Sequence, residues 1–169
     1  MQNQLWHVAA VKNSTSVEAF WLDAGWFNGG FPNGVGNWQF PIEETVDEQF
    51  FPTQTLAPLA AAAHASPNPV QTVVWFEPER VAEGTWIATH HPEFVVPAGG
   101  DLLNLGHADA RTFMTDYLSA AVGNYSLDVL RLDFNTDPAP NWVAGDNESL
   151  QNVSFPNAGM TEQRYILGS

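Results

Sequence analysis

Residues 127–135 read LDVLRLDFN, an apolar run that ends in a polar turn carrying a carboxylate, Asp133. Two earlier stretches have the same form: VEAFWLDAGWF (residues 17–27) and TVVWFEPERV (residues 72–81). Their carboxylates are Asp23 and Glu77. Short, strongly apolar runs are typical of strands buried on both faces of a parallel sheet. The carboxyl ends of parallel strands lie at one edge, where barrel and doubly wound enzymes have their active sites. We therefore expect the three carboxylates to share one rim.

The segments between these strands predict helices. Residues 55–64 (TLAPLAAAAH) are alanine-rich, with Thr55 as a cap and proline in the first turn. Residues 108–122 have apolar side chains at helical spacing, and the following Gly123 and Asn124 are expected to end that helix. Further helical pieces are expected at residues 7–12, 85–90 and 160–167. This alternation of strand and helix predicts right-handed crossovers and a parallel sheet.

The spacing of the strand ends predicts part of a barrel. The three ends lie about 54 residues apart, so a closed barrel of eight such units needs roughly 430 residues. The chain has 169. The predicted fold is α/β, a partial TIM (β/α)₈ barrel of about three consecutive βα units with parallel strands. We expect one domain, residues 1–169, that is incomplete at both ends.

Composition excludes several classes of partner. Five basic and nineteen acidic residues give a net charge of −14, which disfavours nucleic acid and anionic membranes. There is no cysteine, and the five histidines have no metal-ligand spacing, so we expect no metal and no cofactor. No apolar run has the length of a signal peptide or a membrane span. The compartment stays open between cytoplasm and secretion. The exposed edges of an incomplete sheet would favour pairing between copies of the chain, as a homo-oligomer.

Four motifs in this order, WLDAGW, WFEPERV, LLNLG and LRLDFN, resemble the catalytic barrel of glycoside hydrolase family 36, the melibiase-type α-galactosidases. A GNW loop after the first motif and TEQRY after the last extend the resemblance from about residue 17 to residue 165. The resemblance implies retaining hydrolysis of terminal α-galactosides on a (β/α)₈ barrel. It implies a galactoside or oligosaccharide substrate and no cofactor.

The same resemblance assigns roles at the third strand end. The family has a five-residue pattern at this strand end: a basic residue first, an aspartate third and an asparagine fifth. The aspartate of this pattern is the nucleophile, which here is Asp133. Arg131 and Asn135 lie on the same strand face and are expected to contact the sugar. A cation beside the nucleophile also favours its ionised form.

Other rim residues are assigned in the same way. Asp23 matches the first of two adjacent aspartates that bind sugar hydroxyls, and Ala24 replaces the second, which leaves galactose specificity open. Trp38 in the GNW loop matches a tryptophan that walls the sugar subsite, and Trp26 flanks the rim. Glu77 is expected either to contact the ligand or to support Arg131.

The general acid/base of the family lies on a later strand, beyond the end of this chain. We therefore predict that the chain is inactive alone, although its parent is an α-galactosidase-like enzyme. Two alternatives stay open. One is an α-galactosyl transferase or an α-N-acetylgalactosaminidase. The other is a non-catalytic half barrel that binds carbohydrate.

Overall fold

A computed structural model describes residues 1–14, 16–96, 101–134 and 136–143. It contains a three-stranded parallel sheet in the order β1-β2-β3, with β2 in the centre. The strands are β1 (Ala19–Leu22), β2 (Gln71–Phe76) and β3 (Val129–Leu132). Their sequence order equals their spatial order, as in consecutive units of a barrel. The helix expected at residues 160–167 and the candidate residue Asn135 lie outside the described residues.

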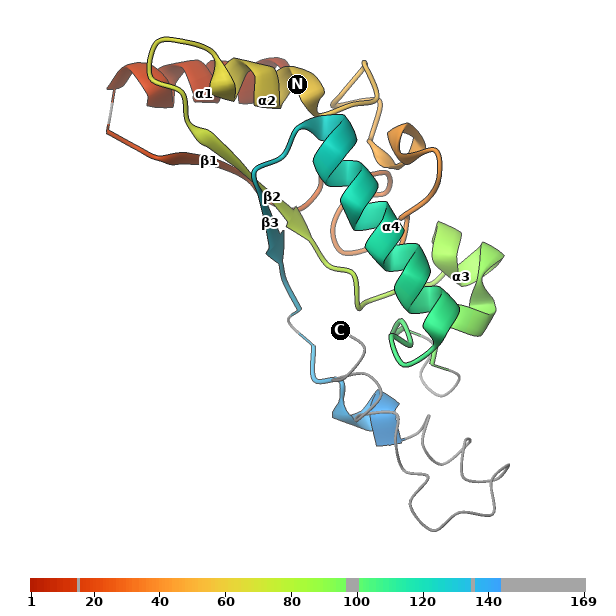
Figure 1. The fold of residues 1–169 in the computed structure, drawn as a ribbon. Helices are drawn as coiled ribbons and strands as arrows, with labels where there is room; N and C mark the ends of the chain where they lie inside the picture. Colours follow the sequence, from red (N-terminus) through yellow and green to blue (C-terminus); the bar gives the residue numbers. More distant parts are fainter. Residues whose placement is uncertain (15, 97–100, 135, 144–169) are drawn as a thin grey trace, which may run out of the picture.

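Helices α1 to α4 lie on one side of this sheet, as Figure 1 shows. They are α1 (Gln2–Ser14), α2 (Ala57–His64), α3 (Trp86–His90) and α4 (Ala108–Tyr125), with short 3₁₀ turns η1 (Ile42–Thr45) and η2 (Pro92–Phe94). The expected helices at residues 55–64, 85–90 and 108–122 are confirmed within a few residues. The Thr55 hydroxyl accepts a hydrogen bond from the Ala57 N–H at 3.1 Å, which supports the first turn of α2. In the described part of the chain, no helix is both long and apolar enough to cross a membrane.

The end of α4 differs from the prediction. The helix runs through Gly123 and Asn124 to Tyr125, and Ser126 ends it in the left-handed conformation with a φ of 57°. Tyr125 is fully buried, and its hydroxyl donates to the Ile42 carbonyl at 2.6 Å. This anchor holds the last turn in place, so tertiary packing overrides the weak helix propensity of glycine and asparagine.

The two faces of the sheet differ in burial. Phe20 and Leu22 pack into the core, whereas the alternate residue Trp21 on β1 is 51% exposed. The prediction that this strand is buried on both faces is therefore wrong within this chain, because the helices cover only one face. On β2 the last three residues are all buried, because the loop that follows β1 folds over them. The uncovered face, hereafter the open face, carries Trp21 and Arg131.

Candidate active site at the carboxyl ends of the strands

Asp133 lies directly after β3, where hydrogen bonds and an ion pair hold it. Its N–H donates to the Phe76 carbonyl at 2.9 Å, which extends the pairing with β2. Its Oδ1 forms an ion pair with Arg131 Nη1 at 2.6 Å and accepts a hydrogen bond from the Phe134 N–H at 3.0 Å. Its Oδ2 accepts from the indole Nε1 of Trp75 at 3.0 Å. Because 18% of the Asp133 side chain is exposed, the carboxylate is fixed in direction yet open to solvent. The N–H groups and the guanidinium around it stabilise its ionised form.

Arg131 projects from the open face and joins two strands. Besides its ion pair with Asp133, Nη1 donates to the Leu132 carbonyl at 3.1 Å. Its guanidinium lies over the ring of Trp21, 5.5 Å from the centroid. The side chain is 34% exposed, so its remaining donors face the volume above the sheet. A guanidinium that is anchored in this way can still donate to an oxygen-rich ligand.

Glu77 directly follows β2 and is fully buried. Its Oε2 accepts from Arg80 Nη2 at 2.5 Å. Burial raises the pKa of Glu77; the hydrogen bond and charge of Arg80 act in the opposite direction, and the nearby charge of Asp133 adds to the rise. The prediction that Glu77 supports Arg131 is wrong, because its ion pair is with Arg80 while Arg131 pairs with Asp133. Its burial also keeps it from touching a ligand in this structure.

Trp26 and Trp38 are core residues here, each 1% exposed. The indole of Trp26 donates to the Trp75 carbonyl at 2.9 Å, and that of Trp38 donates to the Glu77 carbonyl at 3.3 Å. The two rings lie 6.0 Å apart. Trp38 lines no pocket described for this structure, so the expectation that it walls the sugar site is corrected. Trp26 borders the pocket beside Asp23, and its place at the sugar site stays a prediction. The N–H groups of both indoles fasten the loop after β1 to the end of β2.

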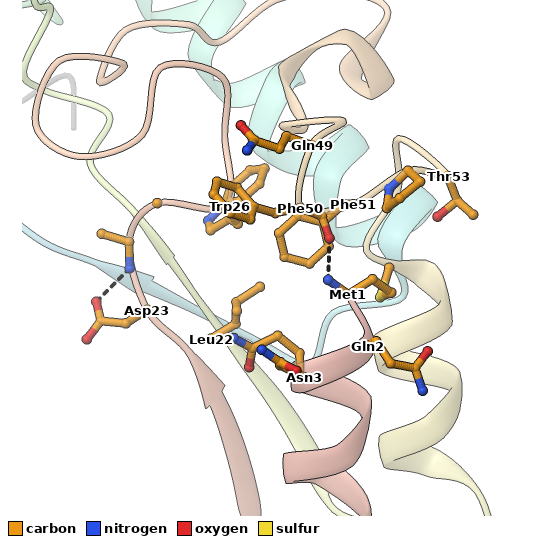
Figure 2. A pocket seen from close by; sticks show the side chains of 14 residues that line it. Met1, Gln2, Asn3, Leu22, Asp23, Trp26, Gln49, Phe50, Phe51 and Thr53 are labelled. Carbon is orange, nitrogen blue, oxygen red and sulfur yellow. Dashed lines mark hydrogen bonds between the residues drawn. The ribbon is translucent and has the colours of Figure 1, made fainter.

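Asp23 lies directly after β1 and is exposed, with Oδ1 accepting the Ala24 N–H at 2.8 Å. It borders a pocket of about 700 Å³ between the end of β1, the start of α1 and residues 49–53. Figure 2 shows Asp23 at the margin of this pocket and the Met1 amino group donating to the Phe50 carbonyl. The lining combines carboxamides with apolar and aromatic side chains: Gln2, Asn3, Gln49, Leu22, Phe50 and Phe51. Carboxamides beside aromatic rings suit a polyhydroxylated ligand.

The structure thus brings Asp133 and Arg131 into contact and places Glu77 close behind them. The sequence interpretation missed Trp75 and Trp21 as partners of this pair. A signal was present, because Trp75 is the register partner of Arg131 on the neighbouring strand, and cross-strand partners lie side by side. Among the described residues, no group of three or more histidines, aspartates or glutamates is placed to hold a metal ion.

The sequence model of the melibiase family matches residues 1–154. This chain belongs to the melibiase family. A curated relative, alpha-galactosidase 2 of Hypocrea jecorina, is 25% identical to the melibiase chain over 145 residues. That match covers 76% of this chain and 19% of the relative, so the chain spans about a fifth of the length of the fungal protein. The predicted family is confirmed.

Solved structures agree on the fold of this melibiase-family chain. The GH36 alpha-galactosidase AgaA of Geobacillus stearothermophilus superposes with a TM-score of 0.71 at 19% identity, over 99% of this chain and 23% of that one. AgaB of the same organism gives 0.70 at 20% identity, over 98% and 22%. TtGalA of Thermus thermophilus gives 0.62 at 20% identity, over 98% and 30%. The predicted partial barrel, with three consecutive parallel strands, is confirmed.

Proposed function

We propose that this chain forms part of the catalytic barrel of a retaining α-galactosidase, with Asp133 as the nucleophile. The observation that carries the proposal is the setting of Asp133. It is a partly exposed carboxylate at a strand end, aimed by an indole N–H and paired with Arg131. Two similar structures are complexes with galactosides. AgaA, in a variant form, holds raffinose, and TtGalA holds p-nitrophenyl α-D-galactopyranoside.

The reaction has two displacement steps. A carboxylate oxygen of Asp133 attacks the anomeric carbon, the bond from that carbon to the leaving oxygen breaks, and a galactosyl ester forms. The leaving oxygen takes its proton from a second carboxylic acid. Water then attacks the anomeric carbon, gives its proton to that second carboxylate, and releases galactose and free Asp133.

The second carboxyl group must lie about 5–5.5 Å from the nucleophile in a retaining enzyme. Glu77 does not suit this role because it is buried and paired with Arg80. In the family, the acid/base follows a later strand than β3, so we assign that role to none of the described carboxylates. Without it, poorly activated galactosides are expected to react about 10²- to 10⁴-fold more slowly.

Three further residues are proposed to bind the sugar. The exposed carboxylate of Asp23 is suited to accept hydrogen bonds from hydroxyl groups, and the exposed donors of Arg131 are suited to sugar oxygens. Asn135 is proposed on the family pattern alone. The small side chain of Ala24, next to the pocket described above, leaves room for a substituent on the sugar.

The test uses residues 1–169 and an activated dinitrophenyl α-galactoside, whose leaving group needs little proton donation. We expect a burst of dinitrophenol close to one per folded chain, together with a galactosyl adduct on the peptide that contains Asp133. Asp133→Ala should abolish both signals. Asp116→Ala, which changes an exposed aspartate of α4, should preserve them. A burst that survives in Asp133→Ala, or an adduct on another residue, would refute the assignment.

A further inference from the structure

Trp75 joins the core to the candidate nucleophile. It is the next-to-last residue of β2, and only 2% of its surface is exposed. Its indole Nε1 nevertheless reaches the rim and donates to Asp133 Oδ2 at 3.0 Å. Because the indole is buried, its N–H has little access to water. It therefore depends on the Asp133 carboxylate as its hydrogen-bond acceptor.

The ring that carries this N–H is held on several sides. Phe27 stacks on it at 5.7 Å with an interplanar angle of 17°, and Phe31 contacts it edge to face at 5.8 Å. Its backbone carbonyl accepts the indole N–H of Trp26 at 2.9 Å. The direction of the N–H is therefore fixed by core packing. Arg131, by contrast, is one-third exposed and has a long, rotatable side chain.

We propose that Trp75 is a positioning residue for Asp133, which orients the plane of the carboxylate for attack on the anomeric carbon. The inference rests on the proposed function of Asp133. The indole N–H holds Oδ2 while Arg131 and the Phe134 N–H hold Oδ1, so rotation of the carboxylate breaks bonds at both oxygens. A nucleophile prealigned in this way reacts without first being ordered. The alternative is that Trp75 only anchors the end of β3.

A pH titration tests whether the contact between Trp75 and Asp133 forms in the folded chain, and the burst rate described below separates the two roles. In the folded chain, with indole nitrogens and aspartate carboxyls isotopically labelled, the Trp75 Nε1–H resonance should shift with the same midpoint as the Asp133 carboxyl carbon. In the Asp133→Asn variant, the chemical shift of the Trp75 Nε1–H resonance should be independent of pH. Trp75→Phe keeps an aromatic ring against Phe27 but removes the N–H. Loss of a hydrogen bond to the anion should raise the midpoint of Asp133 by about one pH unit.

Among the described residues, the charged groups that face Asp133 include Arg131, which pairs with it, and Glu77, which lies close behind it. Each titration is therefore repeated in the Glu77→Gln variant. There the Trp75 Nε1–H resonance must still shift with the same midpoint as the Asp133 carboxyl carbon. Trp38→Phe is the matched control, because it removes an indole N–H from the same cluster, one that donates to a backbone carbonyl. It should leave the midpoint of Asp133 unchanged.

The rate of the dinitrophenol burst tests the catalytic purpose of the contact. Above the midpoint, Trp75→Phe should slow the burst roughly 10- to 100-fold with the amplitude per folded chain preserved, and Trp38→Phe should not. An unchanged midpoint or an unchanged rate in Trp75→Phe overturns the proposal, as does a chain that shows no folded Trp75 resonance. If the indole titrates with Asp133 but the burst survives in Asp133→Ala, the contact is real and the proposed function is what fails.

Discussion

Asp128 offers a quantitative test of how the opposite end of the sheet is held together. One of its oxygens, Oδ2, accepts the Thr72 N–H at 2.7 Å, the Thr72 hydroxyl at 2.9 Å and His64 Nε2 at 2.7 Å. These three bonds connect the segment before β3 to β2 and to the end of α2. We predict that Asp128→Ala destabilises the chain by about 2–3 kcal/mol at pH 7.

The magnitude follows from burial. Thr72 is 1% exposed, so its N–H and hydroxyl lose their partner without gaining water, at about 1–3 kcal/mol for the unsatisfied groups. The His64 contact adds little, because 38% of the His64 side chain and 30% of the Asp128 side chain are exposed. For a chain of this size, the loss corresponds to a fall in Tm of about 4–12 °C.

The effect should depend on pH in a definite direction. Partial burial of Asp128 acts to raise its pKa, but hydrogen bonds from the Thr72 backbone, His64 and the Thr72 hydroxyl outweigh it and lower the pKa. A carboxyl whose folded pKa lies below its unfolded value stabilises the fold above the unfolded value, about 4, and this contribution is lost as pH falls through the folded pKa. The difference in unfolding free energy between wild type and Asp128→Ala should therefore become smaller below about pH 4.

Urea unfolding followed by circular dichroism, from pH 3 to pH 7, measures this difference. Asp116→Ala, at an exposed position of α4, is the control and should change stability by less than about 0.5 kcal/mol. A loss under about 0.5 kcal/mol for Asp128→Ala at pH 7, or a loss that is constant with pH, would refute the reasoning.

Three other predictions concern stability. Tyr125→Phe should cost about 1–3 kcal/mol in urea unfolding, because the buried carbonyl of Ile42 loses its donor. Gly36→Ala should lower the thermal midpoint and cost about 2–4 kcal/mol, since Gly36 has a φ of +111° and a Cβ there would lie 2.5 Å from Thr85 Oγ1. Glu77 has a raised pKa, so the folded state holds this proton longer than the unfolded state does. Stability should therefore fall as pH rises from about 4.5 toward the folded pKa, and Glu77→Gln should flatten that slope.

For each of these three predictions, a specific result would contradict the stated reason. For Tyr125, a variant as stable as wild type would show that the carbonyl of Ile42 finds another partner. For Gly36, the comparison is Gly84→Ala, where φ is also positive, at +76°, but a Cβ would meet nothing within 4 Å. Equal losses at both sites would mean that backbone strain, and not the clash with Thr85, sets the cost. For Glu77, an unchanged slope in Glu77→Gln would place the titrating group elsewhere.

The position of the three carboxylates at one edge of the sheet was predictable, because it depends on short sequence patterns at each strand end. An apolar run followed by a carboxylate marks each strand end, and the alternation with helices requires the three ends to be parallel. Asp133 and Arg131 stand two positions apart on one strand, so their contact follows from the strand period alone. The tryptophans were less predictable. Trp26, Trp38 and Trp75 all follow or end a strand, yet the structure buries all three.

The sequence by itself determined the order of strands and helices, the parallel sheet, the family and the shared edge for Asp23, Glu77 and Asp133. These follow from hydrophobic period and from motifs that are read along the chain. Only the tertiary structure decided that Glu77 pairs with Arg80. It also decided that Trp75, and neither Trp26 nor Trp38, donates its indole N–H to a carboxylate. The physical reason is that the contact between Glu77 and Arg80 depends on how the chain turns after β2. The indoles and their acceptors come from different segments, and packing of the loop after β1 fixes their directions.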